Sequence, residues 1–414
     1  MAKIFLSEEQ CDRLFINEED NPAYKRSNAN ATNLKMIWAA IDEKQRNLQK
    51  IVFGNLNDKL LDIASEKLKQ MGDKYAEIPK TICNAGNKKL PASVLIINMS
   101  SSLMCPSYYL GICLIKNGAC YAQNDENRHV NNVLPQRWKT DIMHTQMLQQ
   151  YQQGDKTPIK EYFRLIETYI QLGNAYCENI YRDTITKMEM RLKRKLTDSE
   201  KELFRVQSSD YKITDVRLNE TGDFQCQLAV DLWDKFAGKI KKKYGISTHA
   251  YTARKLDFSK TKNIAINASR NDINIGEEKI RQFKAVDDNV YNRYTGGTET
   301  INRQPVLGVT NNGKYYYKCP CTSEESKCGQ CGVCFEKNKT GKEYTIFVKY
   351  HGVINANGLK GLFTKNEINN VIEKMYQNNW ITPEEYQKYK SNNQQKKLSN
   401  ISKKIYSKRK TSKK

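Results

Sequence analysis

The chain of 414 residues contains no apolar run that approaches the roughly 18 residues of a membrane-spanning helix. Its first residues, Met-Ala-Lys-Ile-Phe-Leu-Ser-Glu-Glu, place acids where a secretory signal has its apolar segment. We therefore expect no cleaved signal, no membrane association and a cytoplasmic location. Phosphate-binding loops, dinucleotide-binding glycine motifs, protein-kinase motifs and serine-nucleophile elbows are also absent. These absences exclude the commonest nucleotide-dependent enzymes.

Acidic residues are outnumbered, because 68 Lys and Arg against 46 Asp and Glu give a net charge of +22. Such an excess favours polyanionic partners, usually nucleic acid, although an AT-biased genome also enriches lysine. Half of the surplus lies at the end of the chain, where residues 388–414 hold 11 Lys or Arg and no acid. We predict that 388–414 is a disordered basic tail that binds nucleic acid, with DNA as the expected partner. Its densest cationic positions are Lys403, Lys404, Lys408, Arg409 and Lys410.

The body of the chain alternates between strand-like and helix-like patterns. Short apolar or alternating runs predict strands at 91–99, 212–219, 247–252, 263–268, 283–286, 305–310 and 314–318. Helical periodicity is present at 33–72, 136–207, 226–243, about 275–282 and 362–386. Strands that alternate with helices over 212–310 imply parallel pairing through helical crossovers. The fold class is therefore α/β, with a (β/α) barrel-like or partial barrel core; a doubly wound sheet is the alternative.

The predicted organisation has four parts. They are an N-terminal helical region (1–88), an α/β core (89–336), a C-terminal strand with a helical hairpin (337–387) and the basic tail (388–414). The core contains a helical insert at about 136–207 and a cysteine-rich module at 319–334.

The strongest chemical signal is a late group of five cysteines within 16 residues. The group comprises Cys319, Cys321, Cys328, Cys331 and Cys334. Thiolates two or three positions apart on a tight loop converge on one tetrahedral metal, and Gly329 and Gly332 permit that tight loop. Without a signal peptide such clusters predict metal ligands before disulfides. Spacing alone does not separate zinc from an iron–sulfur cluster.

An earlier group of three cysteines, Cys105, Cys113 and Cys120, follows the predicted strand at 91–99. Its spacing matches neither a standard zinc pair nor the three-cysteine motif of radical enzymes that use S-adenosylmethionine. A second metal or cluster site, a site shared with the late group, and ordinary buried thiols all remain open.

In parallel α/β folds, sites lie at the carboxyl ends of the strands. Asp223 follows Gly222 at such an end and is the first candidate for a catalytic carboxylate. The alternative is that Asp223 caps the helix at 226–243, because Asp is a favoured cap residue. Asp287 and Asp288, after the strand at 283–286, are the candidates for a second carboxylate.

Several segments together resemble the family of phage proteins named after gene product 88. These are Met104-Cys-Pro through Gly118-Ala-Cys-Tyr-Ala122, Val216-Arg-Leu-Asn-Glu-Thr-Gly-Asp-Phe224, Ala250-Tyr-Thr252, Ile266-Asn-Ala-Ser269, and Cys319-Pro through Cys334. The resemblance covers about 90–336, without the helical insert or the tail, and implies a phage-encoded protein in the host cytoplasm. A further similarity, to transglycosylases that insert 7-deazaguanine bases, implies a (β/α) barrel with a late zinc site. It also implies a carboxylate nucleophile and a second carboxylate, roles for Asp223 and for Asp287 or Asp288. The late group departs from the transglycosylase pattern of three cysteines and one histidine.

Three functions follow from these features. The first is a DNA base-modifying transferase with structural zinc, in which the tail holds the polyanion. The second is an iron–sulfur enzyme on a barrel scaffold. The third is a non-enzymatic zinc protein that binds DNA or RNA. We expect Asp223→Asn to abolish turnover in either enzyme and to leave binding intact in the third case.

Overall fold

The computed structural model describes residues 133–208, 212–269 and 365–391, with shorter pieces between 83 and 126 and between 281 and 349. Several predictions lie outside the described residues. These are the helices at 33–72, the tail beyond 391, Cys113, Cys120, Cys321, Asp287 and Asp288.

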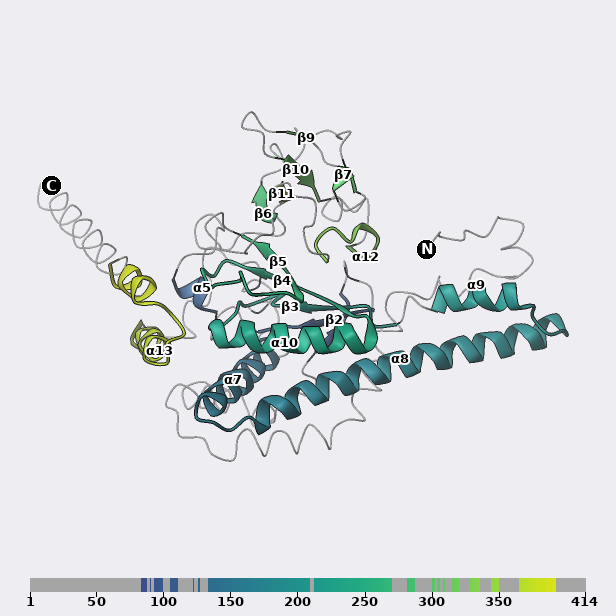
Figure 1. Cartoon of the computed structure of the whole chain (residues 1–414), viewed down its shortest axis with the longest axis horizontal. Coiled ribbons are helices and arrows are strands. Elements are labelled where there is room, and N and C mark those ends of the chain that lie inside the picture. Colours follow the sequence, from purple (N-terminus) through teal and green to yellow (C-terminus); the bar gives the residue numbers. More distant parts are fainter. Residues whose placement is uncertain are drawn as a thin grey trace, which may run out of the picture.

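A mixed sheet forms the centre of the described fold (Figure 1), in the order β1-β2-β3-β4-β5-β6-β11-β10-β9. Its strands are β1 (Asn84–Ala85), β2 (Val94–Ile97), β3 (Asp215–Leu218), β4 (Ser247–Thr252), β5 (Ile264–Ala268), β6 (Arg281–Val286), β9 (Gly308–Val309), β10 (Tyr315–Lys318) and β11 (Tyr344–Lys349). The strands from β2 to β10 in this order pair in parallel, and β1 and β9 are antiparallel at the two ends. The α/β class and the parallel pairing are confirmed. Among the described strands, no pairing joins the two ends of the sheet into a barrel.

Side chains alternate across the sheet, so that its two faces differ in chemistry. On one face Leu95, Val216 and Ile264 occupy neighbouring positions and enter the main hydrophobic core. This face packs against α7 (Val133–Gln152), α8 (Thr157–Leu192) and α10 (Gln227–Tyr244). The opposite face carries polar side chains in its centre, among them His249 and Asn267, and α12 (Cys328–Cys331) lies on that side in Figure 1.

The predicted insert consists of α7, α8 and α9 (Asp198–Ser208). The distal half of α8 extends beyond the sheet, and α9 folds back along it (Figure 1). Buried Met188, Leu196 and Phe204 join the two helices. A capping box begins α9, since Glu200 N donates to Thr197 Oγ1 at 3.2 Å and Thr197 N donates to the Glu200 carboxylate at 2.8 Å. The distal half of α8 and α9 therefore form a helical arm with a small core of its own, whereas α7 and the first half of α8 belong to the main core.

The C-terminal hairpin is confirmed and runs further than expected. It contains α13 (Lys365–Gln377) and a second helix over 383–391, so the first four residues of the predicted disordered tail are helical. Tyr386 stacks on Tyr376 at 4.2 Å, and Tyr389 donates to Asn369 Oδ1 at 2.9 Å. These contacts between the two helices extend the second helix beyond the predicted end at 387.

Two boundaries near the end of the core were wrong. The helix expected to run to 282 gives way to β6 at 281, because parallel pairing with β11 begins there. The single strand expected at 305–310 is divided between β8 (Gln304–Pro305), which pairs with β7 (Thr300–Ile301), and β9, which pairs with β10. Among the described residues, no helix has both the length and the apolar character needed to cross a membrane.

Candidate functional site

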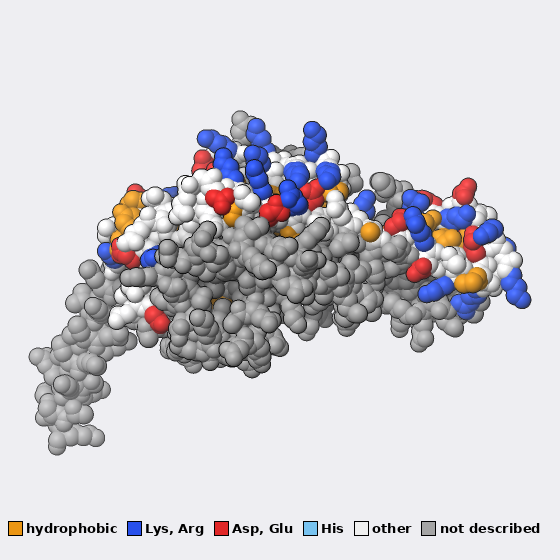
Figure 2. Space-filling model, turned by 90° about the horizontal axis from the view of Figure 1, so that it is seen from below, with side chains coloured by type: hydrophobic (Ala, Val, Ile, Leu, Met, Phe, Trp, Pro, Cys, Tyr) orange, Lys and Arg blue, Asp and Glu red, His pale blue; other side chains and the backbone are white. Residues whose placement is uncertain are grey.

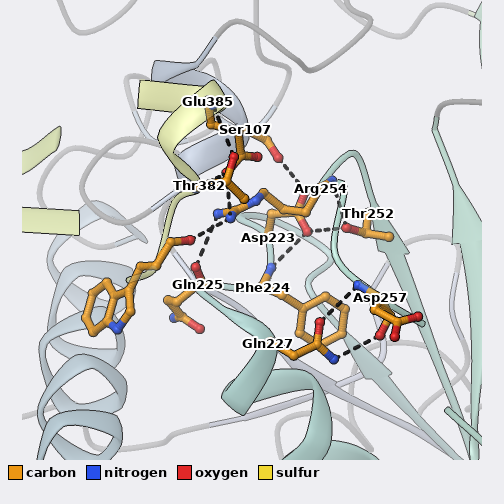
Figure 3. A network of polar contacts seen from close by, with 11 residues as sticks. Ser107, Asp223, Phe224, Gln225, Gln227, Thr252, Arg254, Asp257, Thr382 and Glu385 are labelled. Atoms are coloured by element: carbon orange, nitrogen blue, oxygen red, sulfur yellow. Dashed lines mark hydrogen bonds and ion pairs between the residues drawn. The ribbon is translucent and has the colours of Figure 1, made fainter. Parts of the chain in front are cut away.

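The carboxylate of Asp223 lies between the carboxyl ends of β3 and β4 and is 3% exposed. Figure 3 shows donors converging on it from three segments of the chain. Oδ2 accepts hydrogen bonds from Ser107 Oγ at 2.6 Å and from Ala253 N at 2.9 Å. Oδ1 accepts from Thr252 Oγ1 at 2.6 Å and from Phe224 N at 2.8 Å. Each oxygen thus receives one hydroxyl and one backbone N–H.

The turn after β3 brings Asp223 to this position. Asn219 and Gly222 adopt left-handed backbone conformations, with φ of 54° and 79°. Gly and Asn are the residues that tolerate such angles best. Thr221 Oγ1 donates to Met99 O at 2.5 Å, and Met99 N donates to Thr221 O at 3.2 Å. The turn is therefore fastened to the end of β2 as well as to β4.

Burial raises the pKa of Asp223 above its ordinary value, and hydrogen bonds from Ser107, Thr252 and Ala253 oppose that rise. A carboxylate with both oxygens occupied has to release a donor before it attacks a sugar carbon or takes a proton. The geometry of Asp223 is therefore that of a structural residue, which holds the turn after β3, the end of β4 and the segment of Ser107 together. The alternative role as a helix cap was wrong, because Cys226 occupies the N-cap position of α10.

Arg254 connects this cluster to the C-terminal hairpin, and sequence reasoning missed it. Its side chain is 0% exposed. The guanidinium donates to Gln225 O at 3.2 Å, to Trp380 O at 2.6 Å and to Glu385 Oε2 at 3.2 Å (Figure 3). Glu385 also accepts from Thr382 N at 2.9 Å, so it caps the last described helix while it pairs with Arg254. The hairpin is thereby held against the carboxyl edge of the sheet.

The first cysteine group starts at the same edge. Cys105 is 7% exposed and lies two residues before Ser107, the donor to Asp223. It directly precedes α5 (Pro106–Tyr109), in the connection between β2 and α7. Cys113 and Cys120 belong to this same connection in sequence and lie outside the described residues.

The late cysteine segment packs along the polar face of the sheet. Cys319, Cys331 and Cys334 contact the small core of Tyr317, Val333, Tyr344 and Ile346. Cys328 and Phe335 pack against Leu90, Val94 and Ile96. All four described late cysteines are partly exposed and form no disulfide.

The backbone around these thiols makes a tight turn. Gly332, which follows Cys331, adopts a left-handed conformation with φ of 67°. Gly332 N donates to Cys328 O at 2.8 Å, and Phe335 N donates to Gly332 O at 3.0 Å. A Cys-x-x-Cys pair followed by a left-handed glycine suits a metal-binding loop. Among the described residues, no three His, Cys, Asp or Glu side chains lie close enough together to hold a metal ion.

Polar and aromatic side chains dock this segment on the sheet. Asn267 Nδ2 donates to Cys334 O at 3.1 Å, and the His249 ring stacks on Phe335 at 4.3 Å. Burial raises the pKa of Tyr251, and the neighbouring Cys334 thiol adds to the rise. The guanidinium of Arg217 lies over the Tyr251 ring at 4.8 Å. Arg217 therefore lies on the opposite face of the sheet from Thr252, the donor to Asp223.

The comparisons with known proteins add no identity. No family model, no curated protein and no solved structure matches the chain. The resemblance to the phage family therefore stays a prediction.

Proposed function

We propose that this protein is an iron–sulfur enzyme that acts on nucleic acid, with its cluster held by Cys105, Cys113 and Cys120. The position of Cys105 carries the proposal. It is buried at the carboxyl edge, where the connections of parallel α/β sheets form their sites, and the rest of its group follows in the same connection. Thiolates are the usual ligands of iron–sulfur clusters.

The strand order supports a barrel-like scaffold. From β2 to β6 each strand lies beside the next one along the chain, with helices in the first two of these connections. Consecutive parallel order is the arrangement of (β/α) barrels, whose sites are built from the connections after the strands. We assign the described sheet to a partial barrel of this type.

The late cysteines have a separate role in this proposal. Cys328 and Cys331 pack against the sheet through its polar face, away from the helices. We assign them a structural zinc, because the described loop has the left-handed glycine of a metal-binding turn.

The base-exchanging transferase is less well supported. Its nucleophile was to be Asp223, whose two oxygens already accept four hydrogen bonds in a buried position. Asp287 and Asp288 directly follow β6 and remain the carboxylates for that chemistry.

Metal analysis of protein purified without oxygen tests the proposal. We expect iron and sulfide with a brown chromophore, together with about one zinc. Cys105→Ser should lose the iron and keep the zinc, and Cys328→Ser with Cys331→Ser should lose the zinc and melt at a lower temperature. Cys177→Ser is the matched control, since Cys177 is a buried cysteine on α8. Colourless protein with zinc alone would contradict the cluster, and base exchange on DNA would then be assayed.

A further inference from the structure

Lysines gather on the outward side of α10 and on the connection that follows β4. We call this set the lysine surface; it comprises Lys235, Lys239, Lys241, Lys242, Lys243, Lys260 and Lys262, all exposed. Figure 2 shows Lys and Arg side chains crowded along the upper edge of the molecule, over the horizontal range that α10 occupies in Figure 1. In the sequence, these lysines are separate from the basic tail at 388–414.

Contacts hold the two parts of the lysine surface together. Asn263, next to Lys262, donates to Asp234 O at 3.2 Å and to the Asp234 carboxylate at 3.1 Å. Gly238 is so close to Asn263 that a Cβ on the glycine would lie 2.8 Å from Asn263 Nδ2. The connection after β4 therefore lies along α10, and its lysines extend the row on the helix.

The acids in this area compensate only part of the positive charge. Glu167 accepts hydrogen bonds from Lys239 and Lys243, each at 2.5 Å. Asp234 accepts from Asn263, and Asp231 from Gln227. Among the described residues, Lys235, Lys241, Lys242 and Lys262 form no ion pair with an acid, whereas the charge of Lys260 acts on the nearby Asp257.

We propose that the lysine surface binds the phosphate backbone of double-stranded nucleic acid. Lysine is a point charge that suits phosphate, whereas base edges are read mostly by planar, bidentate side chains. Single strands are held by stacking on aromatic side chains. The one partly exposed aromatic of α10, Tyr244, is bonded to Glu167 instead. A duplex backbone is therefore the partner that these side chains fit.

The course of α10 relates this surface to the candidate site. The helix begins beside Asp223 at the carboxyl edge and spans 18 residues, or roughly 27 Å at 1.5 Å per residue. The lysines occupy its second half, and Arg254 anchors the tail-bearing hairpin at the other end. A duplex that touches both regions covers on the order of 20–25 Å, or about seven base pairs. The inference rests on the proposed function. It names a nucleic-acid duplex as the substrate class and proposes that the duplex backbone lies along α10.

Binding of the full chain to a fluorescent 24-base-pair duplex tests the inference, with salt varied from 50 to 200 mM. Lys235→Gln with Lys242→Gln removes two charges that pair with no described acid. Lys187→Gln with Lys193→Gln on the arm is the matched control, since both lysines are exposed. We expect the first variant to bind about tenfold more weakly and its slope of log K against log salt to fall by about 2, while the control stays unchanged.

Equal losses in the two variants, no loss in the first, or tighter binding of a single strand than of the duplex would each overturn the lysine surface. A second measurement uses a chain that ends at residue 391. Without the tail, the remaining duplex affinity should depend more strongly on Lys235 and Lys242. The iron content of each variant is measured alongside. Normal iron with unchanged duplex binding refutes the surface alone, and absent iron with a clear lysine effect refutes the cluster alone.

Discussion

Asp223 and Glu167 are both buried carboxylates, at 3% and 6% exposure, and both accept several hydrogen bonds. Their donors differ. Two hydroxyls and two backbone N–H groups surround Asp223, whereas Lys239, Lys243 and Tyr244 reach Glu167 from the surface of α10. Burial raises the pKa of Asp223. Burial would also raise the pKa of Glu167, but its hydrogen bonds to the two lysines and the tyrosine lower it to about 2.

The contrast separates two uses of a buried carboxylate. Glu167 links α8 to α10 through ion pairs with Lys239 and Lys243, whose side chains are more than half exposed. The negative charge of Glu167 is therefore compensated by two neighbouring positive charges. Asp223 is held by donors fixed in the backbone and in neighbouring strands, and the Arg254 cation beside it is occupied mainly with the hairpin. Such an arrangement of fixed dipoles is typical of a site in which the carboxylate is held in a defined position without a neutralising cation paired to it.

The largest effect is expected from Asp223→Asn. The amide nitrogen can donate to Ser107 or Thr252, but it cannot accept from the backbone N–H that faced the replaced oxygen. One buried donor is left without its acceptor, and stability should fall by about 2–4 kcal/mol, as measured by urea unfolding. Ser107→Ala, which removes one neutral donor, is the control and should cost about 1 kcal/mol. An asparagine variant within 0.5 kcal/mol of the parent, as a rough threshold, would contradict this account.

The expected loss of stability affects how the activity of Asp223→Asn can be interpreted. Loss of turnover with an intact fold was to identify an enzyme, but the observed hydrogen bonds tie the carboxylate to stability. Activity of Asp223→Asn therefore has to be measured well below its melting temperature. The metal content of Cys105→Ser is the more direct test.

Much of the fold could be predicted because its signals are local. Val94 to Ile97 is an apolar run rich in β-branched residues, Thr197 and Glu200 form a capping box, and Gly245 ends α10 with φ of 70°. Each of these signals lies within a few residues of the element it defines. Pairing between distant strands then followed from the alternation of strands and helices.

The candidate site was only partly predictable, since its contacts join residues far apart in sequence. Asp223 was recognised from its position after the strand predicted at 212–219. The Arg254 pair with Glu385 spans 131 residues, and neither residue lies in a pattern that predicts the other. The docking of His249 on Phe335 also depends on how a late loop packs on an early strand. Such contacts are fixed by tertiary packing and leave no periodic signal.

A smaller effect is expected from Glu167→Gln. The amide keeps the shape but loses the charge that attracts Lys239 and Lys243, both of them more than half exposed. Because solvent screens those partners, we expect a loss of about 1 kcal/mol in urea unfolding at neutral pH. Glu161→Gln, on the same helix, removes an exposed ion pair with Arg164 and should change stability by less than about 0.5 kcal/mol. Equal effects of the two changes would show that burial of Glu167 adds nothing.

The smallest effect, and the sharpest test of the comparison, is the pH dependence of these two substitutions. The folded pKa of Glu167 is lowered to about 2, so its contribution is complete above its ordinary pKa of about 4.5 and disappears as the pH falls towards 2. The cost of Glu167→Gln should therefore fade on acidification. The folded pKa of Asp223 is raised, so its contribution is complete below about 3.8 and declines as the pH rises through the folded value. The cost of Asp223→Asn should then be greatest in acid. Urea unfolding of the parent and both variants from pH 2.5 to 7 measures the two slopes. Slopes of the same sign would mean that the two carboxylates share one kind of environment, and the distinction drawn from their donors would fail.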